Sequence, residues 1–153
     1  LYEVLHDTTV EWPDVTTEDS IGAEVLEGLN LNGTQTINLR DANDLITPLA
    51  VAMAIGGGGE IVGASYAQFK ESNRIAGTVE MLAAFSIDVQ STSEGLRISG
   101  GQIPRTPHHI VPTFGDHRMQ MTAVILATKV GAEIEGESLH EVSFPEFLNF
   151  IQP

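Results

Sequence analysis

The sequence predicts an α/β protein that contains a repeated strand–helix–strand–helix–strand–strand unit. Two segments, 49–63 and 122–136, align without a gap at an offset of 73 residues. In each segment an apolar run of helical length leads to a glycine and then to a short Glu-Ile-x-Gly stretch. Seven identical positions in register, with helix ends and strand starts coinciding, favour a true structural repeat over chance. The identical pairs are Ala50/Ala123, Val51/Val124, Ala54/Ala127, Gly58/Gly131, Glu60/Glu133, Ile61/Ile134 and Gly63/Gly136.

The elements follow from hydrophobic periodicity and from residues that start or stop helices. Residues 34–39 alternate as a strand does, and 45–55 form an apolar run of helical length. That helix ends at glycines, which commonly take the left-handed conformation where a helix stops. The other expected elements are the end of a helix at Leu1–Leu5, strands at 60–63, 87–91, 96–99 and 133–136, helices at 70–85, 115–130 and roughly 144–151, and a surface loop at Thr106–Thr113.

Composition narrows the class of protein. The chain has 153 residues, of which 42% are hydrophobic and 18% charged, and this is typical of one folded, water-soluble domain. No uninterrupted apolar stretch approaches the roughly 20 residues that cross a bilayer, so we expect no membrane partner. The net charge is −14 with only seven lysines and arginines, and nucleic-acid binding needs a broad basic surface. We therefore expect no nucleic-acid partner either.

The chain has no cysteine, which excludes disulfides and thiolate chemistry. A protein without cysteine suits a reducing compartment, so we expect a cytoplasmic location. The five histidines include the pair His108 and His109, but the sequence has no HExxH or comparable metal spacing. We expect no metal site.

Three short stretches stand out, each at the expected start of a helix: Asp41–Asp44, Lys70–Arg74 and Gly115–Met119. Helix amino-termini offer free backbone N–H groups and a partial positive charge, so anions bind there. Lys70 and Arg74, four residues apart, would share one helix face. Because the helix dipole favours cations at the opposite end, these side chains suggest an anionic partner.

Each of these residues also has an ordinary structural explanation. Asp44 and Asp116 could cap helices, which is the commonest use of aspartate at such a position. Glu71 could be a solvated acid of a first helical turn. Lys70 and Arg74 could be surface charges paired with acids elsewhere, and His117 could be a half-buried structural histidine. Only the combination of these residues favours a functional site.

The combination resembles the 5-enolpyruvylshikimate-3-phosphate synthase family. Lys70-Glu-Ser-Asn-Arg74 resembles the Lys-Glu-Ser/Thr-Asp-Arg motif of that family, and Gly115-Asp-His-Arg-Met119 its Asp-His-Arg-Met motif. Asp44 with Pro48–Ala52 is similar to the aspartate-led helix that precedes the lysine motif, and Ser143–Phe147 to the terminal Ser/Thr-Phe-Pro signature. The four motifs occur in the family's order. The departures are Asn73 for an aspartate, Val142 for a lysine of many members, and Tyr66–Phe69 for a stretch commonly ending in arginine.

The resemblance implies a fold of six βαβαββ units in two domains, with substrates enclosed between the domains. Each domain would be an inside-out, barrel-like α/β arrangement of mixed sheets with helices packed inside. Residues 1–153 would form part of the carboxyl-terminal domain, about two units, without the amino-terminal domain. In the family that missing domain supplies a lysine and an arginine to phosphoenolpyruvate and most contacts to shikimate 3-phosphate. We therefore expect this chain alone to be inactive.

The resemblance also implies an activity. The family transfers the enolpyruvyl group of phosphoenolpyruvate to the 5-hydroxyl of shikimate 3-phosphate, releases phosphate, and uses no metal or organic cofactor. This is the shikimate pathway, which leads through chorismate to aromatic amino acids. By motif, the catalytic residues would be Asp44, which takes the hydroxyl proton, and Glu71, which exchanges a proton at the methylene carbon. Lys70 would bind shikimate 3-phosphate, and phosphoenolpyruvate would be bound by Arg74, His117 and Arg118.

Two other functions stay open at this point. The related UDP-N-acetylglucosamine enolpyruvyl transferase is disfavoured by the motif pairing and by the lack of cysteine. A non-catalytic anion-binding module on the same scaffold would keep the anion sites without turnover, because a fold does not determine a function.

Overall fold

The computed structural model describes residues 1–9 and 20–151. One complete βαβαββ unit runs through its centre, and its strands form a four-stranded sheet in the order β1-β2-β4-β3. β1 and β2 are parallel, whereas β4 is antiparallel to both of its neighbours. The expected mixed α/β fold is confirmed. The elements of this unit are β1 (Gln35–Asn38), α3 (Ile46–Ile55), β2 (Gly58–Val62), α4 (Arg74–Ala84), β3 (Val89–Ser91) and β4 (Leu96–Ser99).

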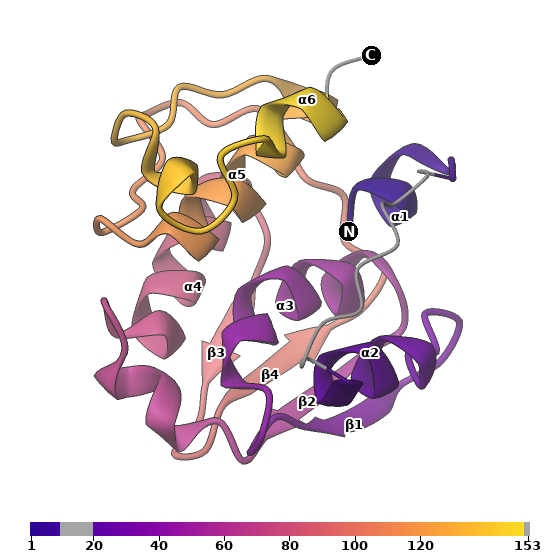
Figure 1. The fold of residues 1–153 in the computed structure, drawn as a ribbon. Coiled ribbons are helices and arrows are strands. Elements are labelled where there is room, and N and C mark those ends of the chain that lie inside the picture. Colours follow the sequence, from indigo (N-terminus) through magenta and orange to yellow (C-terminus); the bar gives the residue numbers. More distant parts are fainter. Residues whose placement is uncertain (10–19, 152–153) are drawn as a thin grey trace.

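Helix α3 lies inside the molecule, between the sheet and α5 (His117–Val130) (Figure 1). It is apolar on all sides, which is the pattern of a helix buried all round rather than of a surface helix. Its one hydrogen-bonding side chain, Thr47, is satisfied inside the core by the hydroxyl of Thr78 at 2.8 Å. The sequence therefore places this helix inside the protein, and the expectation of inward-packed helices is confirmed.

The second copy of the repeat begins in the same way and then departs from the expected pattern. Val111, before α5, and Ile134, after α5, form a single parallel bridge, just as β1 and β2 pair in parallel before and after α3. The predicted strand at 133–136 is wrong, because among the described residues no ladder extends beyond that bridge. The next donor of a parallel ladder would be the N–H of Thr113, and it donates to the side chain of Glu135 at 2.8 Å instead of to the backbone carbonyl of Glu135.

Helix α4 begins at Arg74, four residues later than the sequence predicts. Ser65–Phe69 form a 3-10 turn, η2, and Lys70 is extended. Asn73 then caps α4 by accepting a hydrogen bond from the N–H of Ala76 at 3.1 Å. Lys70 and Arg74 consequently do not share a helix face, and the prediction that they do is wrong.

Glycine ends both long apolar helices, but not in the expected conformation. Gly56, after α3, has φ −82°, and Gly131, after α5, has φ 73° with ψ 142°, so neither is a left-handed helical residue. Gly56 shows the reason for glycine here, because a Cβ atom would lie 2.7 Å from the backbone oxygen of Leu31. Close backbone packing, rather than helix termination, requires a glycine at this position.

The observed boundaries of the remaining elements differ from the expected ones by a few residues. The strand predicted from Ile87 begins at Val89, and the predicted helix at 144–151 begins at Phe147. In the loop at 106–113, Val111 and Thr113 are fully buried, so only part of that loop is a surface loop. In the described part of the chain, no helix is long and apolar enough to span a membrane. The other elements are α1 (Tyr2–His6), the unpredicted α2 (Ser20–Glu27), η1 (Asn43–Leu45), η3 (Leu139–Val142) and α6 (Phe147–Ile151).

Candidate active site

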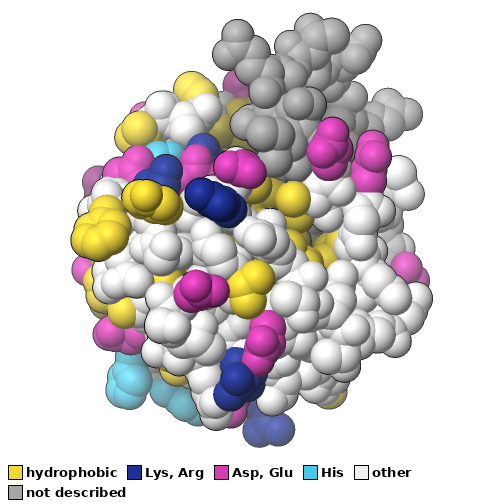
Figure 2. Space-filling model, turned by 90° about the horizontal axis from the view of Figure 1, so that it is seen from below, with side chains coloured by type: hydrophobic (Ala, Val, Ile, Leu, Met, Phe, Trp, Pro, Cys, Tyr) yellow, Lys and Arg dark blue, Asp and Glu magenta, His cyan; other side chains and the backbone are white. Residues whose placement is uncertain are grey.

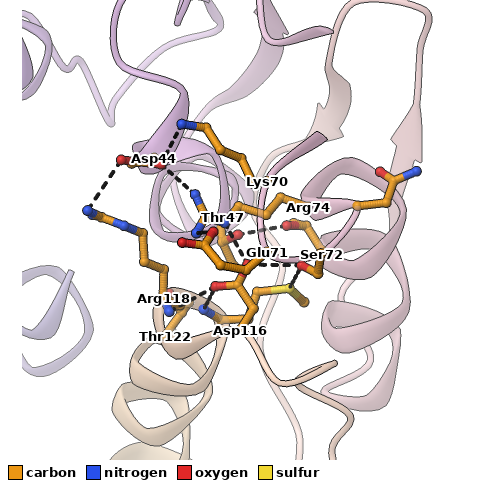
Figure 3. A network of polar contacts seen from close by, with 12 residues as sticks. Asp44, Thr47, Lys70, Glu71, Ser72, Arg74, Asp116, Arg118 and Thr122 are labelled. Atoms are coloured by element: carbon orange, nitrogen blue, oxygen red, sulfur yellow. Dashed lines mark hydrogen bonds and ion pairs between the residues drawn. The ribbon is translucent and has the colours of Figure 1, made fainter. Parts of the chain in front are cut away.

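Three segments that are far apart in sequence meet at one end of the sheet. Residues 39–45 follow the carboxyl end of β1, and 63–73 follow the carboxyl end of β2, which is parallel to it. In open α/β sheets, ligands bind outside the carboxyl ends of the strands. The start of α5 completes the site, so the three stretches singled out in the sequence come together here (Figure 3).

Arg74 joins all three segments. Its Nε donates to Asp116 at 2.7 Å and its Nη2 to Glu71 at 2.6 Å, while its Nη1 donates to Asp44 (Figure 3). The side chain is 1% exposed. Burial lowers the pKa of Arg74, but the hydrogen bond and charge of Asp116, with the charges of Glu71 and Asp44, outweigh burial and raise that pKa. A buried guanidinium with three carboxylate partners is a fixed structural centre of the site.

Asp116 connects this centre to α5. Its carboxylate accepts hydrogen bonds from the N–H groups of Arg118 at 3.0 Å and Met119 at 3.3 Å, so it caps the helix. The capping explanation is therefore confirmed for Asp116, but the same carboxylate also accepts from Arg74 and, at 2.9 Å, from the hydroxyl of Ser72. Burial raises the pKa of Asp116, and the Arg74 hydrogen bond and charge, with the other donors, bring it below its usual value.

Asp44 is the carboxylate on which the exposed cations meet. Its oxygens lie 3.5 Å from Nζ of Lys70 and 3.3 Å from Nη2 of Arg118, in addition to the contact with Arg74. No side-chain hydrogen bond caps α3, so the capping explanation for Asp44 is wrong. Burial raises the pKa of Asp44, but the charges of Arg118, Lys70 and Arg74 together lower it below its ordinary value.

A pocket of about 180 Å³ opens beside Asp44. Arg40 and Asp41 are in its wall, and the motifs in the sequence singled out neither as a ligand contact. On the face shown in Figure 2, the described lysine and arginine side chains lie next to acidic ones and form no broad basic patch. The lining residues of the pocket are Gly22, Arg40, Asp41, Ala42, Asn43, Asp44, Leu45, Lys70 and Arg118.

Most of the residues expected at the site are thus brought together by ion pairs, which connect Asp44, Lys70, Glu71, Arg74 and Arg118. His117, the first residue of α5, is 9% exposed, and no hydrogen bond joins its ring to those five within the described residues. Asp116 and Ser72 were not predicted as site residues. A single sequence does not distinguish an aspartate that only caps a helix, or a serine exposed to solvent, from one that also binds a buried arginine or its partner. In the part of the chain that the structure describes, no acidic and histidine side chains cluster as metal ligands.

The inward-packed α/β unit and the Arg–carboxylate network at its strand ends define the class of protein as a mixed α/β protein with a polar site at one end of its sheet, and comparisons narrow that class. The family model described as EPSP synthase (3-phosphoshikimate 1-carboxyvinyltransferase) matches residues 1–151. The chain therefore belongs to the EPSP synthase family.

Individual relatives agree with the family match. The 3-phosphoshikimate 1-carboxyvinyltransferase of Methanothermobacter thermautotrophicus is 34% identical over 83% of this chain and 32% of its own length. That of Methanosphaera stadtmanae is 36% identical over 73% of this chain and 26% of its own. The solved structure of EPSP synthase from Acinetobacter baumannii is similar with a TM-score of 0.64 and 27% identity, over 71% of this chain and 26% of that one. The chain spans about a third or less of the length of these relatives.

Proposed function

We propose that this chain forms part of the carboxyl-terminal domain of an enzyme that transfers the enolpyruvyl group of phosphoenolpyruvate to the 5-hydroxyl of shikimate 3-phosphate. The observation that carries this proposal is the convergence of Asp44, Glu71 and three cations at the strand ends, in a chain of the EPSP synthase family. The rest of the site would come from a second, amino-terminal domain. The transfer needs no cofactor.

In this proposal Lys70 and Arg118 bind the anionic groups of the substrates. Both side chains are half-exposed, and each forms an ion pair with the Asp44 carboxylate. The distance is 3.5 Å from Nζ of Lys70 and 3.3 Å from Nη2 of Arg118. Phosphate and carboxylate oxygens would compete with Asp44 for them, and a guanidinium matches such groups with two parallel hydrogen bonds. Arg74 would act differently from the family expectation of a direct ligand contact, because its N–H groups are already shared among three carboxylates. It would hold Asp44 and Glu71 in place.

Asp44 would take the proton of the attacking hydroxyl. A carboxylate surrounded by three cations is a weak base, since those charges favour its ionised form. When the substrates draw Lys70 and Arg118 away from it, the pKa of Asp44 would rise and the carboxylate would accept a proton more readily. Binding of the anionic substrates and activation of the base would therefore occur together.

Glu71 would exchange the proton at carbon. During addition, Glu71 acts as the carboxylic acid, having taken up one proton from solvent. The oxygen of the hydroxyl bonds to the central carbon of phosphoenolpyruvate, its proton goes to Asp44, and the methylene carbon takes the proton of Glu71, which leaves the Glu71 carboxylate. During elimination, Glu71 removes a proton from the resulting methyl group, and the leaving phosphate takes the proton from Asp44. Two positioned carboxylates suit this pair of proton transfers. The 2.6 Å contact with Arg74 holds Glu71 beside the site.

The departure at position 73 gives no support to the alternative of a non-catalytic module. Asn73 caps α4 through its side-chain oxygen, and asparagine and aspartate cap helices about equally well. The family match also favours EPSP synthase over the related UDP-N-acetylglucosamine enolpyruvyl transferase. We further infer a cytoplasmic enzyme of the shikimate pathway, which supplies chorismate for aromatic amino acids; the lack of cysteine supports that location.

The experiment that tests the proposal is Glu71→Gln in a protein that joins this chain to the second domain. The amide keeps the shape and hydrogen-bonding capacity of the side chain but removes the base. General acid–base groups typically contribute about 10²- to 10⁴-fold, so kcat for phosphate release should fall by that factor. The matched control is Glu80→Gln, because Glu80 is an exposed acid of α4, the helix that follows Glu71 in the chain. A Glu71→Gln enzyme with normal kcat would refute the proposed role.

A further inference from the structure

We propose that Arg40 is a further substrate-binding residue, which receives a phosphate or carboxylate group of a substrate in the pocket beside Asp44. This inference rests on the proposed function, since it assigns one more ligand contact to the same site. No motif in the sequence includes Arg40. Its assignment comes from the distribution of charge, the backbone around it and the size of the pocket.

The distribution of charge singles out Arg40. The chain has seven lysines and arginines, and four of them lie at this site. Lys70, Arg74 and Arg118 are each already paired with Asp44. Arg40 is exposed, and among the residues that the structure describes it forms no ion pair. Its charge is therefore available to an anion without breaking an existing interaction.

The backbone holds Arg40 in a defined place. Arg40 comes two residues after the end of β1, and the residue between, Leu39, is fully buried. The N–H of Arg40 donates to the side chain of Asn38 at 2.9 Å, and its carbonyl accepts from the side chain of Asn43 at 2.8 Å. Both backbone polar groups are thus fixed, so the side chain starts from a rigid turn at the mouth of the pocket.

The pocket has the size for one anionic group. Pockets that hold whole small molecules usually measure about 300–1,000 Å³, whereas this one measures about 180 Å³. Asp41 lies in the same wall and would repel an anion, so a single cation would bind weakly there. Arg40 together with Lys70 and Arg118 would outweigh that repulsion. We therefore expect the three cations to act as one anion-binding cluster.

The test is a titration of this chain with inorganic phosphate, followed by NMR of the backbone and arginine side-chain N–H groups. Arg40→Ala should weaken phosphate binding about tenfold or more, because a charge-assisted hydrogen bond to the phosphate is lost. The matched control is Arg105→Ala, since Arg105 is an exposed arginine outside the pocket. That variant should bind phosphate as the parent chain does. Unchanged spectra away from the substitution would show that each variant keeps its fold.

The outcomes separate this inference from the proposed function. If Arg40→Ala and Arg105→Ala bind phosphate equally, the assignment of Arg40 is overturned. If Arg118→Ala weakens binding while Arg40→Ala does not, the proposed site stands and only this inference fails. If neither Arg118→Ala nor Arg40→Ala affects binding, or if the parent chain shows no saturable binding, this inference is overturned, whereas the proposed function is decided separately by Glu71→Gln in the joined protein.

Discussion

At the scale of single residues, Arg74 decides how the site is built. Its guanidinium is fully buried and connects Asp116, Asp44 and Glu71, which come from three separate segments. A salt bridge that is buried adds little net stability over apolar packing, but breaking one leaves an uncompensated charge. Arg74 therefore matters to the site as a connector, and its loss should cost stability as well as activity.

Arg74→Met should destabilise the chain by about 3–5 kcal/mol, because Asp116 would keep a buried charge without its partner. Chemical denaturation measured at neutral pH gives the free energy of unfolding. The matched control is Arg97→Met, which removes the exposed ion pair of Arg97 with Glu60 at 2.9 Å. Such surface pairs are worth under about 1 kcal/mol. Equal losses in the two variants would contradict the central role of Arg74.

The low pKa of Asp116 makes stability depend on pH. A carboxylate whose pKa is lower in the folded state contributes stability above its unfolded pKa of about 3.9, and loses it as the pH falls through the folded value. The difference in unfolding free energy between the parent chain and Asp116→Asn should therefore be largest above about pH 5 and shrink below about pH 4. Urea unfolding across this range measures it. A difference that does not change with pH would mean that only the helix cap was lost.

At the scale of elements, the boundaries depend on local caps and on the neighbours available. α4 begins where Asn73 can cap it, not where the charged motif begins. The second strand pair stops after one bridge because the N–H of Thr113 donates to the side chain of Glu135 instead of to its backbone carbonyl. In both cases one side chain next to the element decides where it starts or stops.

Asn73→Ala should destabilise the chain by about 1 kcal/mol, because the N–H of Ala76 loses its partner at the start of α4. Asn73→Asp, which restores the residue common in the family, should retain the cap and nearly all of the stability. Thermal or urea unfolding of the two variants compares them directly. If Asn73→Asp were as unstable as Asn73→Ala, the cap would not explain this position.

At the scale of the whole molecule, the described site is open and incomplete for the proposed reaction. Its pocket of about 180 Å³ is too small for both substrates, and most of its cations are already paired with Asp44. Transfer reactions of this kind need the reacting groups held together and shielded from water. Closure by a second domain would provide both conditions.

This chain alone, mixed with shikimate 3-phosphate and phosphoenolpyruvate, should therefore release no phosphate above background. A protein that joins the chain to the second domain should release phosphate under the same conditions. A coupled phosphate assay compares the two. Sustained turnover by the chain alone would contradict the proposal that two domains form the active site.

The sequence by itself determined the class of fold, the order of the elements and the place of the site. Apolar periodicity, capping residues and the 73-residue repeat can be read directly from the sequence. The bounds of α3, α5 and the strands β1, β2 and β4 could therefore be predicted to within a residue or two. The motifs that contain Asp44, Lys70 and Asp116 identified most of the residues that converge, because these motifs can be recognised from the sequence alone.

Only the tertiary structure decided how those residues divide their tasks. Arg74 and Arg118 read alike in sequence, yet one is buried among three carboxylates and the other is half-exposed. Arg40 carries no signal of its own, and the sequence explained Asp116 only as a helix cap. Both join the site because α5 and the end of β1 are brought beside Asp44. Burial and charge pairing depend on which segments meet in space, and periodicity along one chain does not contain that information.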